Sequence, residues 1–326
     1  MNTEVVISIL IPMYNASQTI ERCLDSLCNQ YPQVFEIIII DDGSNDKSYE
    51  IVSRYSKQYA YIYLYKQNTQ GVSKTRQNLI NYAHGEYIMF CDADDYFEPD
   101  AIAGTIEIIE KVCTYTEKPD IFIFGYKLVR SFGDKIIIRR NFPEGVYSKK
   151  EIGKYHVKSI SDLYWSALWN KCYKRDICLS PEIKFEKQME DVMFNIDFMS
   201  RVEYVYISER CIYNYVQIGE SLTRTKKIDN EEAIINAEKT YYTLMQKLLK
   251  TYPEENIGVL ESIYILCKGL EKRLSYLEGN IDLVLDKKIK KQLGWRIYIL
   301  NVKAKFLEML RLIKKIIKDF LSWLQK

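Results

Sequence analysis

Along the first hundred residues, short apolar runs rich in β-branched side chains alternate with segments in which apolar residues recur at helical spacing. The run Val5–Ile11 is apolar at nearly every position, which predicts a buried strand. The segment after it predicts a helix with one buried face, because its apolar residues recur at intervals of three and four. These residues are Ile20, Cys23, Leu24, Leu27 and Cys28.

The alternation continues to about residue 100 and then changes. Strands are expected at 35–40, 61–66 and 86–91, and helices at 46–58 and 72–83. Strands that alternate with helices are typical of βα units around a mostly parallel sheet, so we predict an α/β fold. Beyond residue 100 we expect helices at 100–113 and 189–200, a strand at 120–124, a hairpin around 125–140, and helical segments at 229–278 and 295–325.

The composition is that of an ordinary globular protein, with 47% hydrophobic and 28% charged residues among 326. It excludes collagen-like, low-complexity and largely disordered chains. The net charge of +2 conceals an asymmetry, because residues 287–326 carry 12 Lys and Arg against two acids, whereas the rest carries 34 against 42. Since the positive charge lies in a C-terminal tail and is not spread over a domain, we expect no nucleic-acid partner.

The eight cysteines form no Cys-x-x-Cys pair and no Cys/His cluster, so the sequence indicates neither a zinc site nor a disulfide framework. The apolar run from Val5 to Met13 is short and broken by Pro12, unlike a secretory signal. No stretch reaches the roughly 18 apolar residues that a transmembrane helix needs. We therefore expect a cytoplasmic protein.

An acidic cluster directly follows the strand expected at 86–91. Its three carboxylates belong to Asp92, Asp94 and Asp95. Such groups repel one another unless a cation is held among them, and a hard divalent ion with bound phosphates is a natural partner. The cluster therefore indicates a Mg²⁺ or Mn²⁺ site for a diphosphate. The alternative is a solvated acidic turn in which Asp95 caps the next helix.

Two further polar loops follow the first two strands. Asp41-Asp42-Gly43 comes after the second strand, and Tyr14 and Asn15 come after the first. Ligands of open α/β sheets bind at the carboxyl ends of the strands, so these loops and the acidic cluster are expected to share one crevice. Taken alone, the Asp41-Asp42-Gly43 loop could equally be a helix-capping turn, and Tyr14 could be a packed side chain.

Four ordered blocks of sequence carry a family resemblance: 6–15, 36–44, 71–76 and 85–95. Together they resemble the family 2 inverting glycosyltransferases with the GT-A fold. The resemblance is close over residues 5–100 and looser between 165 and 215, where Trp169-Asn-Lys and Glu190-Asp carry it. Beyond about 225 there is no family pattern.

This resemblance implies roles for particular residues. Pro12 and Tyr14 match the loop that lines the nucleotide base, Asp42 the acid that accepts from uracil, and Arg76 a block that approaches the diphosphate. In the Asp-x-Asp motif, Asp92 or Asp94 is implied near the ribose, and Asp94 and Asp95 as ligands of Mn²⁺ or Mg²⁺. Asp191 matches the general base; the alternative is that Glu190 and Asp191 merely favour a helix N-terminus.

One feature departs from the sequence pattern of the family, and the absence of another motif narrows the expected activity. Family members often read Arg-Asn-x-Gly where this chain has Arg76-Gln-Asn-Leu79, so no site role is expected for Gln77 or Leu79. The Gln-x-x-Arg-Trp motif of processive synthases is absent, which favours addition of a single sugar. Trp165 and Trp169 could stack on a sugar, but burial in the core is the favoured interpretation.

We expect a GT-A domain over 1–225, with a nucleotide-sugar half at 1–100 and an acceptor half at 101–225. A helical extension follows at 226–286 and a basic amphipathic tail at 287–326. A helix over 295–325, with its lysines and arginines off the apolar stripe, can lie on an anionic membrane. Its alternatives are docking on the protein's own core or on a second subunit of a homo-oligomer.

The predicted function is an inverting, metal-dependent transfer of one sugar from a nucleotide-diphosphate sugar, with UDP the expected nucleotide, to a hydroxyl of a glycan. The tail implies a lipid-linked acceptor at the inner face of the cell membrane, as in surface-polysaccharide biosynthesis. Two alternatives remain. One is a sugar-1-phosphate nucleotidyltransferase, disfavoured because a Gly-rich, basic N-terminal loop is lacking. The other is a non-catalytic glycan- or partner-binding subunit of a membrane polysaccharide-assembly complex.

Overall fold

A computed structural model describes residues 5–114, 118–130, 137–139, 142–160, 162–217, 231–255, 258–259 and 262. The chain divides into two compact units. The first comprises Met1–Ile152 and Ser161–Thr225, and the second comprises Gly153–Ile160 and Lys226–Lys326. All the residues for which a site role is predicted belong to the first unit.

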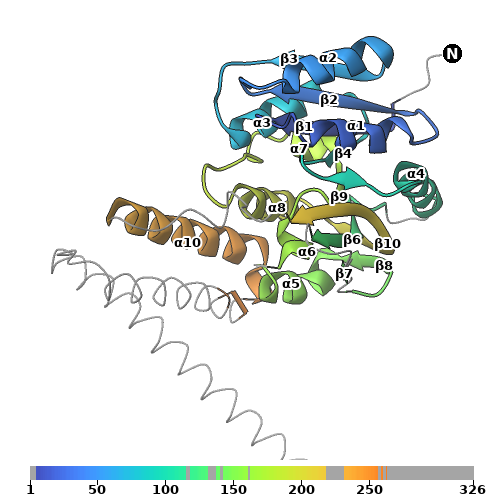
Figure 1. Ribbon diagram of the computed structural model, residues 1–326. Helices are drawn as coiled ribbons and strands as arrows, with labels where there is room; N and C mark the ends of the chain where they lie inside the picture. The colour runs from blue at the N-terminus through green and yellow to red at the C-terminus, as the bar shows by residue number, and fades with distance from the viewer. Residues whose placement is uncertain are drawn as a thin grey trace, which may run out of the picture. The chain divides into compact units, whose positions relative to one another are not determined.

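The first unit begins with four parallel strands joined by helices, which Figure 1 draws in blue to cyan. The elements are β1 (Ile7–Met13), α1 (Ile20–Cys28), β2 (Phe35–Asp41), α2 (Ser48–Gln58), β3 (Ile62–Lys66), α3 (Val72–Tyr82) and β4 (Tyr87–Phe90). The strand order is β3-β2-β1-β4, with Ile9 paired to Ile37 on one side and to Met89 on the other. The predicted alternation of strands and helices is therefore confirmed.

The second half of this unit extends the same sheet. Its elements are β5 (Tyr96–Phe97), α4 (Ala101–Val112), β6 (Ile121–Arg130), β7 (Ile137–Arg139), β8 (Gly145–Ser148), the first four residues of α5 (Lys149–Lys158), α6 (Leu163–Ser166), β9 (Lys171–Lys174), α7 (Arg175–Cys178), α8 (Glu190–Ser200) and β10 (Tyr204–Gln217). The sheet continues β4-β9-β6-β10-β5, with β9 antiparallel to both neighbours and β6 parallel to β10. The mixed α/β architecture with a mostly parallel sheet is the predicted fold class.

The structure differs from the sequence-based expectation around β6 and β10. β6 does not stop at residue 124 but runs to Arg130, and the turn-back predicted near 125–140 pairs its second half with β7. β10, with 14 residues, was not expected. Exposed Glu209 and Arg210 interrupt its apolar pattern where the register with β6 shifts, so periodicity alone does not show one continuous strand.

Burial explains why the N-terminal strands read as continuous apolar runs. Ile9, Leu10 and Ile11 have no exposed surface, and all seven residues of β2 are buried. Strands of a parallel sheet are covered on both faces, so both sets of alternating side chains must be apolar. The two strands hold few polar side chains, and buried Ser8 donates to Glu36 Oε1 at 2.6 Å.

The second unit contains α10 (Glu231–Thr251) and the short helix η1 (Pro253–Glu255). The segment 153–160 packs there, with the His156 Nδ1 atom 2.5 Å from the Tyr252 hydroxyl. Only part of the predicted extension at 226–286 is described, and the predicted tail at 287–326, with the membrane helix at 295–325, lies outside the described residues. Within the described part, no helix has the length and apolarity to cross a membrane.

Candidate active site

The loops after β1 and β2 are joined by hydrogen bonds at the carboxyl edge of the sheet. The backbone N–H of Asn15 donates to Ser44 Oγ at 2.9 Å, and that of Asn45 donates to Asn15 Oδ1 at 3.0 Å. Pro12 lies within β1, next to this junction. The Tyr14 side chain is 54% exposed, so its ring is free to contact a planar group, as expected for a residue lining a nucleotide base.

Asp42 is buried and organises the loop that leads into α3. Its Oδ1 accepts from Gln67 Nε2 at 2.7 Å and from the Gln70 N–H at 2.8 Å, and its Oδ2 accepts from the Gly71 N–H at 2.8 Å. Gly71 has a φ of 90°, a conformation that favours glycine. Asp42 thus fixes the N-terminus of the helix that carries Arg76, and a ligand donor would share oxygens that already accept hydrogen bonds.

Arg76 joins two acidic segments that are far apart in the sequence. Its Nη2 lies 2.9 Å from Asp92 Oδ1, and its Nη1 lies 2.6 Å from Asp191 Oδ1 and 3.5 Å from Glu190 Oε1. The surrounding carboxylates raise the pKa of this guanidinium against the opposing effect of burial. The structure therefore brings the acidic turn after β4 together with the Glu-Asp pair at the start of α8.

The three carboxylates of the acidic turn lie in different environments. Asp94 is exposed, and its backbone carbonyl accepts from Arg22 Nη2 at 2.6 Å. Asp95 is 1% exposed, with Oδ2 accepting from the Tyr213 hydroxyl at 2.9 Å and Oδ1 from the Val216 N–H at 2.7 Å. Desolvation and the other acids of the turn raise the pKa of both Asp94 and Asp95. Asp95 thus anchors the turn to β10, and Asp94 faces solvent.

The predicted divalent ion can be tested against these side chains. Among the described residues, no group of three or more His, Cys, Asp or Glu could hold a metal ion. Mg²⁺ is, however, often held by one or two carboxylates together with substrate phosphates and water. Exposed Asp94 fits such a role, whereas Asp95 as it lies has both oxygens engaged and almost no exposed surface.

Asp191 occupies the first turn of α8, after Met189 in a left-handed conformation with a φ of 50°. Burial raises its pKa to about 7; Glu190 and Asp92 act in the same direction, while Arg76 and Lys171 act against them. Its side chain nonetheless remains 31% exposed. A carboxylate that is accessible and titrates near neutral pH suits a general base, because it is both available and basic enough to accept a proton.

Two residues with no predicted role position the segment beneath Asp191. Lys171 is 2% exposed, and its ammonium donates to the carbonyl of Tyr164 at 3.0 Å and to Asn170 Oδ1 at 2.8 Å. Asn195 Nδ2 donates to the carbonyls of Asp191 at 2.9 Å and Ser166 at 2.7 Å. The sequence signal for Lys171 was the Trp-Asn-Lys motif, whereas Asn195 and the anchoring Tyr213 carried none.

The two candidate sugar-stacking tryptophans are buried. Trp165 is 3% and Trp169 4% exposed. Trp169 stacks on Tyr213 at a centroid distance of 4.8 Å and on Tyr215 at 5.3 Å. Trp169 thus packs against two rings of β10. The expectation that both tryptophans are buried in the core is therefore confirmed.

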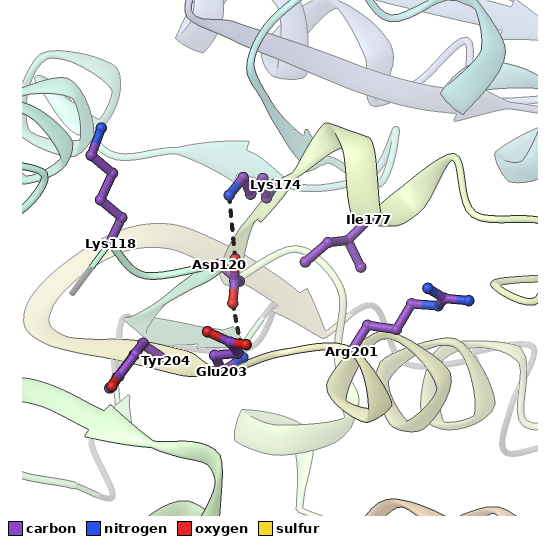
Figure 2. Close-up of a pocket in the computed structure, with 7 residues that line it drawn as sticks. All are labelled: Lys118, Asp120, Lys174, Ile177, Arg201, Glu203 and Tyr204. Atoms are coloured by element: carbon purple, nitrogen blue, oxygen red, sulfur yellow. Dashed lines mark hydrogen bonds and ion pairs between the residues drawn. The ribbon is translucent and has the colours of Figure 1, made fainter.

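A separate cavity of about 500 Å³ lies at the N-terminal ends of β6 and β10, away from the end of β10 that binds Asp95, and Figure 2 shows its lining. The residues are Lys118, Asp120, Lys174, Ile177, Arg201, Glu203 and Tyr204. Asp120 accepts from Lys174 Nζ at 3.4 Å and from the Glu203 N–H at 2.8 Å, and Arg201 pairs with Glu182. None of the predicted site residues lines this cavity.

Comparison with known proteins agrees with this arrangement. The model of the family "Glycosyl transferase family 2" matches residues 8–154. Over these residues, which make up less than half of its length, the chain is similar to glycosyltransferase family 2. The uncharacterized glycosyltransferase YibD of Escherichia coli is 27% identical over 267 residues, which cover 78% of this chain and 74% of that protein. The poly(ribitol-phosphate) beta-glucosyltransferase of Bacillus spizizenii is 42% identical over 100 residues, or 29% of this chain and 16% of that protein.

A solved structure supports the fold of this glycosyltransferase. The crystal structure of S. aureus TarS 1-349 in complex with UDP-GlcNAc matches with a TM-score of 0.60 and 18% sequence identity, covering 83% of each chain. At this identity the likeness establishes the shared GT-A fold. The match to this family's model and the glycosyltransferases among the similar proteins favour a glycosyltransferase over the two alternatives, a nucleotidyltransferase and a non-catalytic subunit.

Proposed function

We propose that this glycosyltransferase is an inverting enzyme that moves one sugar from a UDP-sugar to a hydroxyl of a glycan acceptor. The observation that carries the proposal is the bridge made by Arg76, which binds Asp92 and Asp191 with its two terminal nitrogens. Asp92 belongs to the turn implied in donor binding, and Asp191 is the implied base. One guanidinium thus holds the donor side and the acceptor side of the reaction a few ångströms apart.

The donor would lie along the carboxyl edge of the sheet. Exposed Tyr14 and Pro12 would line the base, the Asp42 loop would accept from it, and Asp92 would approach the ribose. UDP is the proposed nucleotide because an acidic residue matches the position that accepts from uracil, and because TarS, a protein of the same fold, was crystallised with UDP-GlcNAc.

Asp94 would hold the divalent ion, Mn²⁺ or Mg²⁺, together with oxygens of the donor diphosphate. When bound, such an ion would neutralise the charge that develops on the departing phosphate oxygen. Support comes from the exposure of Asp94 in the turn after β4 and from its raised pKa, which is caused by desolvation and by repulsion from the nearby Asp92 carboxylate. A cation there would relieve that repulsion.

Asp191 would take the proton from the attacking acceptor hydroxyl. A single base and a leaving diphosphate on the opposite face of the sugar suffice for an inverting displacement. The described structure contributes one carboxylate in the first turn of α8 whose pKa lies near neutrality, which is what such a step needs.

Two variants test this assignment. Asp94→Ala should abolish Mn²⁺-dependent binding of the UDP-sugar, whereas Asp191→Asn should retain binding and lose transfer. Calorimetry with the donor and a transfer assay with an α-configured UDP-sugar measure the two effects, and NMR of the wild-type product should show a β-linkage. Asp176→Ala, on the exposed face of α7, is a matched control that should change neither. Normal turnover by Asp191→Asn would refute the base assignment.

We further propose that the acceptor is lipid-linked, in surface-polysaccharide assembly, and that residues 295–325 bind the inner face of the cell membrane. The support is the sequence pattern of an apolar stripe with lysines beside it, together with a similar protein whose name gives a polymeric acceptor, the poly(ribitol-phosphate) beta-glucosyltransferase. Truncation after residue 290 should abolish sedimentation with vesicles that contain anionic phosphatidylglycerol. Sedimentation of the truncated chain equal to that of the full chain would contradict this proposal.

A further inference from the structure

We propose that Arg76 is a positioning residue for the base, which holds Asp191 ionised and oriented and does not itself contact the donor diphosphate. The inference rests on the proposed role of Asp191 as base. It differs from the role that the sequence resemblance implied for Arg76, and the difference comes from where its nitrogens point.

The guanidinium of Arg76 is enclosed by protein. Its side chain is 6% exposed, and both terminal nitrogens are used by carboxylates at 2.6 and 2.9 Å. Nε is also buried and has no hydrogen-bond partner among the described residues. Because the guanidinium has so little free surface, it could offer a phosphate little contact unless it left its carboxylate partners.

The charges around Asp191 show why such a partner is needed. Glu190 lies beside it on α8, and Asp92 faces it from the turn after β4, so two acids oppose its ionisation. Lys171 on β9 favours the charged form, but it is fully buried and its pKa is lowered to about 7 by desolvation. Arg76 on α3 is therefore the cation on which Asp191 depends near neutral pH.

The contact with Arg76 also fixes the orientation of the Asp191 carboxylate. Arg76 Nη1 binds Asp191 Oδ1 at 2.6 Å, and no hydrogen bond from a described residue is recorded to Asp191 Oδ2. One oxygen is thus held by the ion pair while the other is available to an acceptor hydroxyl. An Arg can bind Asp92 and Asp191 at once because its nitrogens form a rigid fork, whereas the single ammonium of a Lys cannot do so equally well.

The test compares Arg76→Gln, Arg76→Lys and Asp191→Asn in the full-length chain. Arg76→Gln should move the acidic limb of the pH profile of kcat/KM upward by at least about one unit, which lowers the rate at pH 7 about fivefold. Arg76→Lys should leave the limb near its wild-type position, because the charge remains, but lower kcat several-fold. Donor affinity measured by calorimetry should fall less than tenfold in both, because each variant loses only the tie to Asp92 and no contact with the diphosphate.

A second readout does not depend on turnover. In protein with ¹³C-labelled aspartate, the carboxyl signal that disappears in Asp191→Asn should titrate near pH 7 in the wild type and at least one unit higher in Arg76→Gln. If Arg76→Gln does not fold, Arg76→Met serves in its place, because it also removes the charge and keeps a side chain of similar length.

The outcomes are distinguishable. Loss of donor affinity of tenfold or more in Arg76→Lys, with an unchanged acidic limb, would overturn the inference and assign Arg76 to the donor. An Asp191 titration that is unmoved by Arg76→Gln, or by Arg76→Met, would also overturn it. Normal turnover by Asp191→Asn would instead refute the proposed function, whatever the behaviour of the Arg76 variants.

Discussion

The anchor between β10 and the acidic turn offers a quantitative prediction through Tyr213→Phe. The Tyr213 hydroxyl donates to Asp95 Oδ2 at 2.9 Å and accepts from the Asp92 N–H at 3.0 Å. The variant removes both hydrogen bonds and keeps the ring, whose stacking on Trp169 at 4.8 Å should persist. The perturbation is therefore confined to one oxygen atom.

The expected cost follows from what the hydroxyl leaves behind. A buried acceptor left without its donor costs about 1–3 kcal/mol, and an N–H that loses its partner costs about 1 kcal/mol more. Asp95 is 1% exposed, so water cannot replace the lost donor. We expect the free energy of unfolding of the first unit to fall by about 3 kcal/mol.

Urea unfolding measures this change, and Tyr206→Phe is the matched control. The Tyr206 hydroxyl donates to Glu144 Oε1 at 2.8 Å, but Glu144 is exposed and water can take over the bond. The control should therefore cost less than about 1 kcal/mol. Because the Asp92 N–H also loses its partner in Tyr213→Phe, the affinity for the UDP-sugar should fall several-fold in that variant alone. Equal destabilisation by the two substitutions would refute the reasoning.

Three further predictions concern stability. The pKa of Asp191 is raised to about 7, so the folded state binds a proton more readily than the unfolded state. As the pH rises from 4 to 7, the free energy of unfolding of the wild type should therefore fall by about 1–3 kcal/mol relative to that of Asp191→Asn. Urea unfolding across that range measures the difference, and parallel plots of unfolding free energy against pH would contradict the prediction. The pKa of Lys171 is lowered to about 7, so the unfolded state binds the extra proton above that pH, and thermal unfolding should show wild-type stability rising from pH 7 to 10 relative to Lys171→Met. Gly85→Ala should cost about 1–3 kcal/mol, because a Cβ there would lie 2.7 Å from the backbone nitrogen of Ser8, whereas Gly258→Ala, with its nearest neighbour at 3.4 Å, should cost little in the same urea assay.

The sequence determined the N-terminal half of the fold because its signals are local. Strands β1 and β2 are buried on both faces and are apolar at most positions, and α1 has one buried face, so each leaves a recognisable pattern in the sequence. Polar residues at the strand ends then indicated the crevice. The four ordered blocks there carried the family resemblance, which the comparisons confirm.

Only the tertiary structure decided which acidic residues are buried, which are exposed and which are joined by ion pairs. The sequence does not distinguish Asp92, Asp94 and Asp95, because all three are aspartates in one turn. In the structure, Asp95 alone accepts hydrogen bonds from Tyr213 and Val216, which come more than a hundred residues later. The bridge from Arg76 to Asp191 spans 115 positions and depends on the packing of α3 against the start of α8. Sequence periodicity reports which face of one element is buried; ion pairs between elements depend on how those faces meet in space, and the chain must fold before they exist.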